Sequence, residues 1–371
     1  WDAFVAGAPP LAEWPVLDPS DVAVLQYTGG TTGVPKAAML THTNLMSAQA
    51  VYDAWQSGQG QLRDRIEKVI GVLPLFHVYA MTVVLLRSIH LGNEILLRTR
   101  FDVETALRDI EERRATIFNG VPTMWIALAN HPGIDTRDLR SLVRCSSGGA
   151  PLPQEVGERF ERLTGLTLRG GWGMTETCSP GVALPSEGPV PAGSVGLPLP
   201  GIELQIVATD DPHRGPNVTA GYWNRPQETE AAFADGFFLT GDIGWMDENG
   251  YVFLVDRKKD MIISGGFNVY PQMVEQAIYE HPQVEEVLVV GVPDAYRGEA
   301  AKAFVKLRQG AAGFSLAELQ AFLADKVGRH EMPTALEFRA SLPRTPVGKF
   351  SKTELREEAR RKFDDEARRS A

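Results

Sequence analysis

Cysteine is almost absent from this chain of 371 residues, which contains only Cys145 and Cys178. Two cysteines do not make the disulfide framework of a small secreted domain, so apolar packing must hold the fold together. Cys178 is expected to be a small packing residue rather than a nucleophile. The scarcity of cysteine is typical of a protein from a reducing, cytoplasmic compartment.

Long apolar runs are lacking as well. The most apolar stretch, 81–86, is cut short by Arg87 and His90 and stays well below the ~18 residues that a membrane-spanning helix needs. We recognise no signal peptide at the start of the chain. An excess of basic residues is also missing, and the formal net charge of −10 argues against nucleic acid as the main partner.

What the chain does contain is an ordinary share of apolar residues, 43%, and of charged residues, 23%, as globular enzymes do. Its length allows two or three domains, each with a core of its own. Strand and helix patterns alternate over the first part, with strands expected at 69–73, 94–97, 115–118 and 142–145 and helices at 81–89 and 103–114. This β-α-β rhythm predicts an α/β fold with largely parallel sheets covered by helices.

The architecture is expected to change after residue 185, where prolines and glycines become frequent. Apolar residues alternate or cluster at 201–207 and 250–255, which predicts a smaller antiparallel or barrel-like unit. Beyond Arg257 the pattern is that of a compact α+β domain. Its expected elements are a helix at 271–279, strands at 287–290 and 302–307, a helix opened by a capping box at Ser315 and burying Leu316, Leu319, Leu323 and Val327, and a charged helical end at 356–369.

The most informative segment is a loop rich in glycine and threonine, Thr28-Gly29-Gly30-Thr31-Thr32-Gly33-Val34-Pro35-Lys36. It follows an apolar stretch at 22–25 that we expect to be a short buried strand. The glycines let successive N–H groups turn toward one anion, and the threonine hydroxyls and the lysine add donors and a positive charge. These properties indicate a site for nucleotide phosphates. A plain turn with a surface lysine is the alternative.

Spacing excludes two common nucleotide motifs. A Walker loop has glycine directly before its lysine, where this chain has Pro35, and serine or threonine directly after it, where this chain has Ala37. A dinucleotide fingerprint fails at 171–176, because Glu176 stands in place of the third glycine. The loop therefore belongs to another class of phosphate-binding site.

Five segments, taken in order, resemble those of the adenylate-forming enzymes, a superfamily of acyl-CoA synthetases, luciferases and peptide-synthetase adenylation domains. These segments are 28–36, 171–177, 240–242, 256–260 and 343–349. The wording at 26–30, with Gly29 where many relatives carry serine, is most similar to bacterial medium- and long-chain fatty acyl-CoA synthetases. Measured against the family, a long N-terminal portion is absent and 208–215 is irregular, so we expect a fragment or a join.

The resemblance implies a large ATP- and acyl-binding domain over 1–258, with a smaller β-rich subdomain at 186–256. A mobile C-terminal α+β domain would follow over 259–371, with Lys259 at the hinge position. After a first half-reaction this domain would rotate and bring Gly265 and Gly266 to the activated acid. Their small size would leave space for the narrow pantetheine arm of CoA.

The resemblance also implies the residues that bind ATP. Those expected at the phosphates are Thr28, Gly29, Gly30, Thr31, Thr32, Gly33 and Lys36, with Thr175 and with Glu176 as the Mg²⁺ ligand. Those expected around adenine and ribose are Gly148, Gly149, Ala150, Pro151, Gly171, Trp172, Gly173, Asp242 and Arg257. Taken singly, these residues could also be ordinary turn residues, a surface glutamate and a surface arginine.

Lys349 is the expected catalytic cation, because an exposed proline- and glycine-rich turn can carry an ammonium group between a carboxylate and the α-phosphate. Lys352 is the nearby alternative. His77 matches a residue that lines the acyl site, although an isolated histidine among apolar residues is often part of a core. The segments 74–79 and 118–125 are expected to form an apolar pocket wall. With no obvious lysine or arginine there for a second carboxylate, a monocarboxylic acid of medium or long chain is favoured.

The resulting hypothesis is an ATP-dependent acyl-CoA synthetase that makes acyl-AMP, releases pyrophosphate and then makes acyl-CoA, with Mg²⁺ as cofactor and CoA as co-substrate. Two alternatives stay open: an acyl-AMP ligase that loads a carrier protein, and a non-catalytic nucleotide-binding module. The expected partners are the acid, ATP and CoA, without nucleic acid and without a transmembrane segment. Peripheral contact with a membrane and a homodimer are both compatible with the resemblance.

Overall fold

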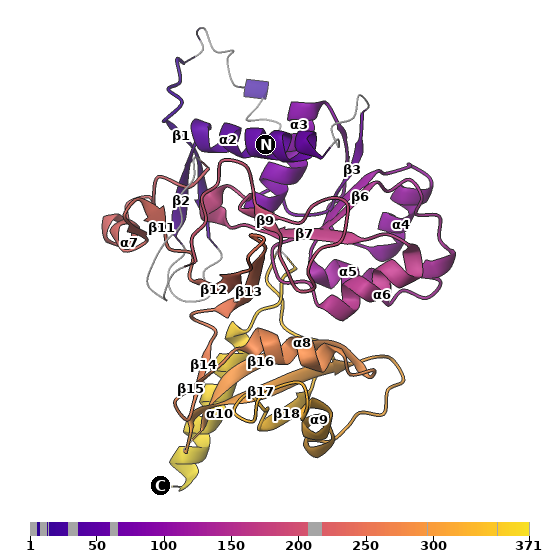
Figure 1. Ribbon diagram of the computed structural model, residues 1–371, viewed down its shortest axis with the longest axis vertical. Helices are drawn as coiled ribbons and strands as arrows, with labels where there is room; N and C mark the ends of the chain where they lie inside the picture. The colour runs from indigo at the N-terminus through magenta and orange to yellow at the C-terminus, as the bar shows by residue number, and fades with distance from the viewer. Residues whose placement is uncertain are drawn as a thin grey trace.

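The computed structural model describes residues 6–7, 13, 15–28, 36–59, 66–206, 217–294, 296–346 and 348–370. Figure 1 shows a large domain of sheets and helices above a smaller domain, which begins at strand β14 (Ile262–Ser264). The chain passes from one to the other after strand β13 (Val252–Arg257). The mixed α/β architecture expected from the sequence is confirmed.

A seven-stranded sheet forms the centre of the large domain, in the order β4-β3-β5-β6-β7-β8-β9. The first five strands are parallel, whereas β8 and β9 are antiparallel to their neighbours. Their bounds are β4 (Glu94–Leu97), β3 (Lys68–Gly71), β5 (Ile117–Gly120), β6 (Arg144–Ser147), β7 (Leu168–Trp172), β8 (Val182–Ala183) and β9 (Leu197–Pro198). The carboxyl ends of β5, β6 and β7 meet at one edge, where open α/β sheets bind their ligands.

Helices cover both faces of this sheet. The helices of one face are α4 (Val103–Glu111), α5 (Pro122–Ala129) and α6 (Gln154–Thr164), and those of the other are α2 (His42–Gly58), the π-helical η1 (Ala80–Leu86) and α3 (Arg87–Leu91). Alternation along β5 serves both faces: Phe118 joins the core with Trp125 and Phe160, while its neighbour Ile117 packs with Val84 of η1. The helix expected at 81–89 is present, but its first half is π-helical, which the apolar pattern did not indicate.

Several predicted strand positions needed correction. Strands β5 and β6 each begin two residues later than expected, and α4 ends at Glu111 rather than 114. Strand β1 (Val22–Tyr27) forms a hairpin with β2 (Ala37–Thr41), so the phosphate loop connects two antiparallel strands. The prediction that this strand is buried is wrong, because Val22, Leu25 and Tyr27 are exposed.

The β-rich part of the large domain consists of short antiparallel pairs. These are β10 (Phe233–Ala234) with β11 (Phe237–Phe238), next to α7 (Pro226–Glu230), and β12 (Asp242–Met246) with β13. The apolar cluster at 250–255 overlaps β13, whose antiparallel pairing with β12 is the kind expected there. The strand expected at 201–207 is not found at 201–206, and residue 207 and the irregular segment at 208–215 lie outside the described residues.

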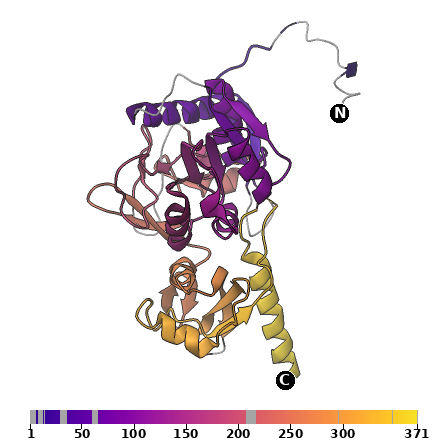
Figure 2. The same ribbon diagram turned by 90° about the vertical axis from the view of Figure 1, so that its right-hand side faces the viewer.

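The small domain pairs a β-sheet with helices, as expected. Strands β15 (Phe267–Val269), β14, β17 (Gly298–Leu307) and β16 (Val284–Asp294) lie in that order, and β18 (Ala335–Phe338) pairs with β17. The helices are α8 (Pro271–Tyr279), α9 (Leu316–Leu323) and α10 (Thr353–Ser370). The Ser315 capping box of α9 is confirmed, although only Leu319 and Leu323 of the four expected core residues are fully buried. In Figure 2, α10 runs along one side of this domain, away from the large one.

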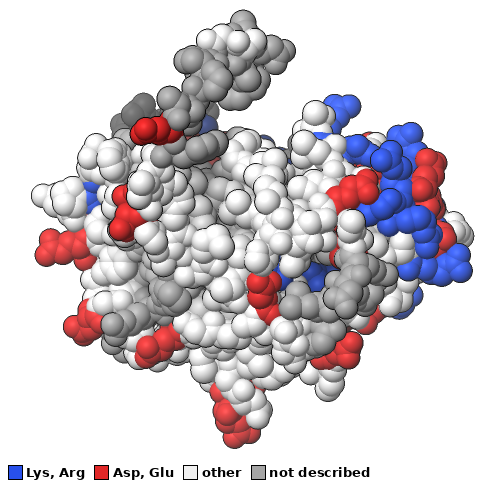
Figure 3. All heavy atoms as spheres, turned by 90° about the horizontal axis from the view of Figure 1, so that it is seen from above, with Lys and Arg blue, Asp and Glu red and all other residues white. Residues whose placement is uncertain are grey.

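Charged side chains are unevenly spread over the large domain. Seen from above, lysine and arginine gather on one side with acidic side chains among them (Figure 3). Around α4, Arg137 bonds Glu111 at 2.8 Å and Arg114 bonds Asp138 at 3.2 Å, and Arg98 pairs with Asp109. These pairs tie the helix to the neighbouring loop.

Two expectations about absent features can be examined over the described ranges. There, Cys145 and Cys178 are both free and buried, and Cys178 packs in an apolar cluster with Leu40 and Phe238. Within the same ranges, none of the helices combines the length and the apolar character that a membrane crossing requires.

Candidate active site

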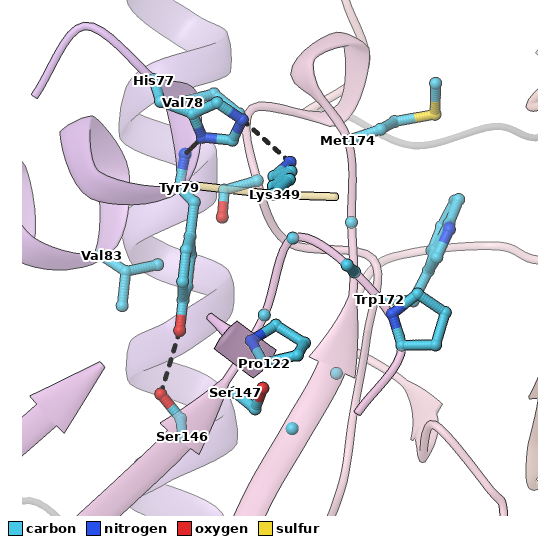
Figure 4. A pocket seen from close by; sticks show the side chains of 18 of the residues that line it. His77, Val78, Tyr79, Val83, Pro122, Ser146, Ser147, Trp172, Met174 and Lys349 are labelled. Carbon is cyan, nitrogen blue, oxygen red and sulfur yellow. Dashed lines mark hydrogen bonds between the residues drawn. The ribbon is translucent and has the colours of Figure 1, made fainter. Parts of the chain in front are cut away.

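One continuous cavity of about 1900 Å³ lies at the carboxyl ends of β5, β6 and β7 and extends between the two domains. Its lining includes Asp242 and Arg257 from the large domain and Lys349 from the small domain. Figure 4 shows its centre, where side chains from both domains converge. Residues that are far apart in the sequence therefore line one cavity.

Lys349 reaches this cavity on a tight turn. Thr345 N–H donates to the carbonyl oxygen of Lys349 at 2.7 Å, and Gly348 takes a left-handed φ of 81° that favours glycine. The hydroxyl of Thr123, at the start of α5, donates to the carbonyl oxygen of Gly348 at 2.9 Å. The large domain thus holds the turn through its backbone and leaves the lysine side chain free to project inward.

His77 is the immediate neighbour of Lys349. The Nζ atom of the lysine lies 3.1 Å from Nε2 of the histidine (Figure 4). Burial and the nearby charge of Arg257 lower the pKa of Lys349 to about 8, and burial and the charge of Lys349 lower the pKa of His77 to about 4. At neutral pH the imidazole is therefore neutral, and the lysine is poised close to its titration point.

The glycines expected beside adenine make room for protein side chains. A Cβ atom at Gly148 would lie 2.8 Å from the ring of Tyr79, and one at Gly149 would lie 2.7 Å from Cε of Lys349. Ala150 and Pro151 line the cavity next to them. The segment thus forms a cavity wall that other groups can approach closely, and the side chains packed against it are those of Tyr79 and Lys349.

Asp242 is held from two sides. Its Oδ2 accepts from Nε1 of Trp172 at 2.6 Å, and its Oδ1 accepts from Nε of Arg257 at 2.8 Å. Burial acts to lower the pKa of Arg257, but the charge of Asp242 outweighs it and the pKa is raised. The three residues face each other because β12 pairs with β13, which places Asp242 opposite Arg257, and because β7 ends at Trp172.

The glycines around Trp172 are required by backbone packing. A Cβ atom at Gly171 would lie 2.3 Å from the carbonyl oxygen of Val182, and one at Gly173 would lie 1.4 Å from that of Ser179. Neither position tolerates a side chain, so the turn that presents Trp172 and Thr175 to the cavity depends on them. Thr175 opens the short helix η3 (Thr175–Thr177) and lines the cavity.

Glu176 is buried beside a residue that the sequence motifs did not indicate. The hydroxyl of Tyr222 donates to Oε1 of Glu176 at 2.8 Å, and Nζ of Lys36 lies 4.9 Å from the centre of the same tyrosine ring. Burial and the charge of Glu176 raise the pKa of Tyr222. The only signal in the sequence was a tyrosine in Gly221-Tyr222-Trp223, shortly after the irregular segment.

In the described part of the chain, Glu176 is a candidate metal ligand that does not belong to a cluster of such ligands. Among the described residues, no group of three or more histidine, cysteine, aspartate or glutamate side chains is placed to hold a metal. Magnesium is usually bound by one or two carboxylates together with phosphate oxygens of the substrate. Glu176, buried at the cavity and fixed at one oxygen, fits that kind of site.

The remaining predicted site residues separate into three groups. Five residues of the phosphate loop lie outside the described residues, namely Gly29, Gly30, Thr31, Thr32 and Gly33. The residues on either side of them are joined, because the N–H of Thr28 donates to the carbonyl oxygen of Lys36 at 2.8 Å. Lys259 lines the cavity. Gly265 and Gly266 form the exposed turn between β14 and β15, with φ values of 58° and 83°, and do not line it.

The acyl side of the cavity differs from the expected apolar pocket. Leu75, His77 and Val78 do line it, but Phe118, Met124 and Trp125 belong to the buried core instead. As expected, neither 74–79 nor 118–125 contains a lysine or an arginine. Elsewhere, arginines on three separate elements line the cavity, namely Arg87 of α3, Arg144 of β6 and Arg169 of β7. Sequence spacing could not reveal that these three line one cavity, because they belong to separate elements of the fold.

Polar contacts away from Lys349 also join the domains. Arg308, directly after β17, donates through Nη1 to Oδ1 of Asn130 at 2.7 Å, and its Nη2 lies 3.4 Å from Oε1 of Glu155. Oδ2 of Asp256 accepts from the N–H of Gln272 at the start of α8, at 2.8 Å. The present orientation of the small domain is thus held at several points around the Lys349 turn.

Comparison with known proteins places these features in context. Residues 4–223 match the family model described as AMP-binding enzyme, and residues 273–349 match the model described as AMP-binding enzyme C-terminal domain. A long-chain-fatty-acid–CoA ligase of Bacillus subtilis (strain 168) is 44% identical over 357 residues, which cover 93% of this chain and 63% of the relative. A feruloyl-CoA synthase of an Amycolatopsis species is 38% identical, covering 91% of this chain and 70% of the relative. The chain thus spans less than two thirds of the length of the Bacillus relative.

Among solved structures, ATP-bound MatB from Rhodopseudomonas palustris has a TM-score of 0.85 at 33% identity, over 95% of this chain and 71% of that one. The apo structure of the same protein, over the same shares of the two chains and at 32% identity, has a TM-score of 0.73. The arrangement seen here is therefore more similar to the ATP-bound form than to the apo form.

Proposed function

Because the chain belongs to the family of AMP-binding enzymes, we propose that the protein it forms is an ATP-dependent acyl-CoA ligase. It activates a carboxylic acid of the medium- or long-chain fatty class as acyl-AMP, releases pyrophosphate and transfers the acyl group to CoA. The observation that carries the proposal is the position of Lys349, inside a cavity that also presents Asp242, Trp172 and Glu176. The printed function of the Bacillus relative supports the class of acid.

The chemistry requires stabilisation of negative charge at one phosphorus atom. Attack of a carboxylate on the α-phosphate concentrates charge there, and a cation placed in advance lowers the barrier without reorganising. Lys349 supplies that cation, held by its turn and by Thr123. When the substrates are bound, their negative charges favour the protonated form of Lys349. His77 is neutral, so it adds no positive charge that would oppose this protonation.

The nucleotide is positioned by the large domain. Asp242 retains lone pairs beyond those that accept from Trp172 and Arg257, and these can accept from the ribose hydroxyls. Lys36 and Thr28 stand at the two ends of the phosphate loop. Glu176 would hold Mg²⁺, which when bound supplies charge neutralisation at the phosphate oxygens. Tyr222 fixes the orientation of that carboxylate.

The second half-reaction requires a different orientation of the small domain. Gly265 and Gly266 are exposed and do not line the cavity, so they serve CoA only after the domain has turned about Lys259. The higher TM-score to ATP-bound MatB supports assigning the present orientation to adenylation. A boundary at 258/259, a cytoplasmic location, membrane contact and dimerisation stay predictions.

The test is carboxylate-dependent exchange between ATP and pyrophosphate, measured with the full-length protein across short, medium, long and dicarboxylic acids. Exchange with at least one of these acids is expected. Its absence with all of them would favour a nucleotide-binding module without catalysis. Product assays with free CoA and with a phosphopantetheinyl carrier protein then decide the acceptor, and acyl transfer to the carrier alone would contradict the CoA ligase.

A further inference from the structure

Lys352 lines the same cavity as Lys349 but binds a different partner. Its Nζ lies 2.8 Å from Oε1 of Glu275, and the two side chains are only 16% and 14% exposed. The same carboxylate oxygen accepts from the N–H of Val289 at 2.7 Å. The ammonium group of Lys352 therefore binds a protein carboxylate, whereas that of Lys349 lies beside His77.

A second buried carboxylate approaches this ion pair from the large domain. Asp256 of β13 is 5% exposed, and its Oδ2 accepts from the N–H of Gln272, at the start of α8, at 2.8 Å. Glu275 follows Gln272 by three residues on the same helix, so the two positions are neighbours on its surface. Helical side chains lean toward the N-terminus, which carries the carboxylate of Glu275 toward Asp256. Each domain thus contributes one acid to the same part of the interface.

The charge of Lys352 acts on both of these acids. Burial raises the pKa of Glu275, and the charge of Lys352 opposes this rise. Burial also raises the pKa of Asp256, and again the charge of Lys352 opposes it. The charge of Asp256 adds to the rise at Glu275, as like charges do when they lie close together. Lys352 is therefore a cation that two carboxylates from different domains share.

Neighbouring charges form pairs of their own. Asp260 pairs with Arg356 of α10 at 2.9 Å, and Asp242 pairs with Arg257 at 2.8 Å. The charge of Asp260 acts on Asp256 in the same direction as burial does. Loss of the cation at position 352 would therefore leave an acidic place at the junction of the domains.

The backbone joins Lys352 closely to the catalytic turn. The N–H of Ser351 donates to the carbonyl oxygen of Pro343 at 2.9 Å, which closes the base of the turn that carries Lys349. On the other side, the carbonyl oxygen of Lys352 accepts from the N–H of Arg356 at 3.0 Å, in the first turn of α10. The two lysines are thus held by one short and well-bonded segment, so they move together.

Rotation of the small domain would separate the shared cation from one of its acids. Glu275 and Lys352 belong to the small domain, whereas Asp256 precedes Lys259, the expected hinge. The Glu275–Lys352 pair would leave as a unit, and Asp256 would stay behind. Attraction between Lys352 and Asp256 therefore favours the present orientation and is lost in a rotated one.

We propose that Lys352 is a positioning residue for acyl-AMP formation, the counter-ion that lets Asp256 and Glu275 meet and so stabilises the orientation in which Lys349 enters the cavity. This rests on the proposed function, since it assigns Lys352 to one half of that reaction. Lys352 acts through the interface between the domains and contacts neither the acid nor the α-phosphate.

The experiment measures each half-reaction of the full-length protein by rapid quench, with decanoate and with hexadecanoate. Lys352→Met should slow acyl-AMP formation by about tenfold or more, because it leaves a buried charge without its partner. Thioester formation from supplied acyl-AMP should be unchanged or faster. Lys352→Arg should keep most of the adenylation rate, because arginine retains the charge.

Two results would count against the assignment in different ways. An equal loss of both half-reactions in Lys352→Met, or no loss in either, would overturn the role of Lys352 and leave the ligase assignment intact. Absence of acyl-AMP formation by the unmodified protein with both acids would instead overturn the proposed function, and this role with it.

A double variant distinguishes a counter-ion from a catalytic cation. Lys352→Met combined with Glu275→Gln removes the cation together with one acid, while the amide oxygen can still accept from Val289. We expect acyl-AMP formation to return to within about threefold of the unmodified rate, because the two losses are coupled through one interaction. A loss as large as that of a catalytic lysine would overturn the proposal. This variant decides by itself if Lys352→Met does not fold.

Lys302→Met is the matched control. Lys302 pairs with Glu337 at 2.7 Å within the small domain, its side chain is 17% exposed, and neither residue lines the described cavity. The ratio of the two half-reaction rates should stay unchanged in this variant. A change as large as that in Lys352→Met would show that loss of any ion pair of the small domain has this effect, and would overturn the specific role of Lys352.

Discussion

At the scale of single residues, the centre of the site is a lysine with two unequal neighbours. Lys349 lies 3.1 Å from the neutral His77, and Arg257 acts on it through its positive charge. Both burial and this charge disfavour the ammonium form, so the lysine is held close to its titration point until anionic substrates arrive. The neutral histidine occupies the place beside Lys349 at which we expect an anionic substrate group to bind.

Replacement of this lysine separates the two half-reactions. Lys349→Ala should slow acyl-AMP formation by about 10²–10³-fold, the usual loss when one preorganised charge-stabilising group is removed. Formation of the thioester from supplied acyl-AMP should be largely spared, because that step places no new charge on the α-phosphate. Rapid-quench assays of each half-reaction measure both. An equal loss in the two would refute the assigned role.

The pH profile follows from the same residue. The pKa of Lys349 is lowered to about 8 in the free protein, so the required ammonium form is present below that pH and is lost above it. We expect kcat/KM for acyl-AMP formation, which reports the free enzyme, to fall as pH rises through about 8. Lys349→Arg should remove this limb, because arginine stays protonated. A profile that stays flat to pH 10 in the unmodified protein would contradict the assignment.

Tyr222 offers a second test at this scale. Its hydroxyl donates to Glu176, and a hydrogen bond to a charged group contributes ~1.5 kcal/mol or more. Tyr222→Phe should therefore raise the Mg²⁺ concentration for half-maximal acyl-AMP formation by about tenfold, while the ring still contacts Lys36. Titration of activity with Mg²⁺ measures this shift. Tyr251→Phe, in the turn between β12 and β13, is the control and should leave the titration unchanged.

At the scale of elements, turns rather than helices carry most of the site. The Lys349 turn depends on the left-handed Gly348, and the Trp172 turn depends on glycines that no side chain could replace. The turn between β14 and β15 is built in the same way but faces solvent in this orientation. Its two glycines have open space around them, so their small size has no packing reason here.

That turn yields a prediction opposite to the one for Lys349. Gly266→Leu should slow thioester formation from supplied acyl-AMP by about tenfold or more, because a side chain would narrow the path for pantetheine, and acyl-AMP formation should be retained. Gly310→Leu is the matched control, since Gly310 has a φ of 80°, close to the 83° of Gly266, and also has open space around it. Both variants carry the same backbone strain of ~1 kcal/mol. A defect confined to adenylation would argue against the CoA path.

At the scale of the whole molecule, two domains are held together by a ring of polar contacts around one catalytic turn. Thr123, Arg308 and Asp256 each take part in a contact between the domains, and only the first is next to Lys349. Polar contacts are suited to an interface that must open and close, because water can replace them. We therefore expect the orientation that delivers Lys349 to be an equilibrium that single residues can shift.

Arg308 tests this equilibrium from a distance. Arg308→Met removes the bond to Asn130 and the pairing with Glu155, which together contribute ~1 kcal/mol. We expect acyl-AMP formation to fall by about fivefold and thioester formation from supplied acyl-AMP to be unchanged or faster. Arg339→Met is the control, because Arg339 pairs with Glu358 within the small domain. Equal effects of the two variants on adenylation would show that the loss is one of stability, not of orientation.

Much of this could be derived from the sequence because it depends on local order. The β-α-β rhythm determined the parallel sheet, and the helix at 271–279 and the strand at 94–97 were predicted at their observed bounds. The motifs that contain Trp172, Asp242, Arg257 and Lys349 were identified by their resemblance to short segments of the adenylate-forming enzymes, and all four residues line one cavity. Local propensity and turn chemistry need only neighbouring residues, so the chain alone specifies them.

What only the tertiary structure decided involves residues from distant segments. The sequence could not indicate that Tyr222 holds Glu176, that Gly149 makes room for Lys349, or that Phe118 and Trp125 turn into the core instead of the pocket. It also could not reveal that Arg87, Arg144 and Arg169 line one cavity, because they come from α3, β6 and β7. Which side chains share a space depends on sheet register and helix docking, and those are set by packing over the whole domain.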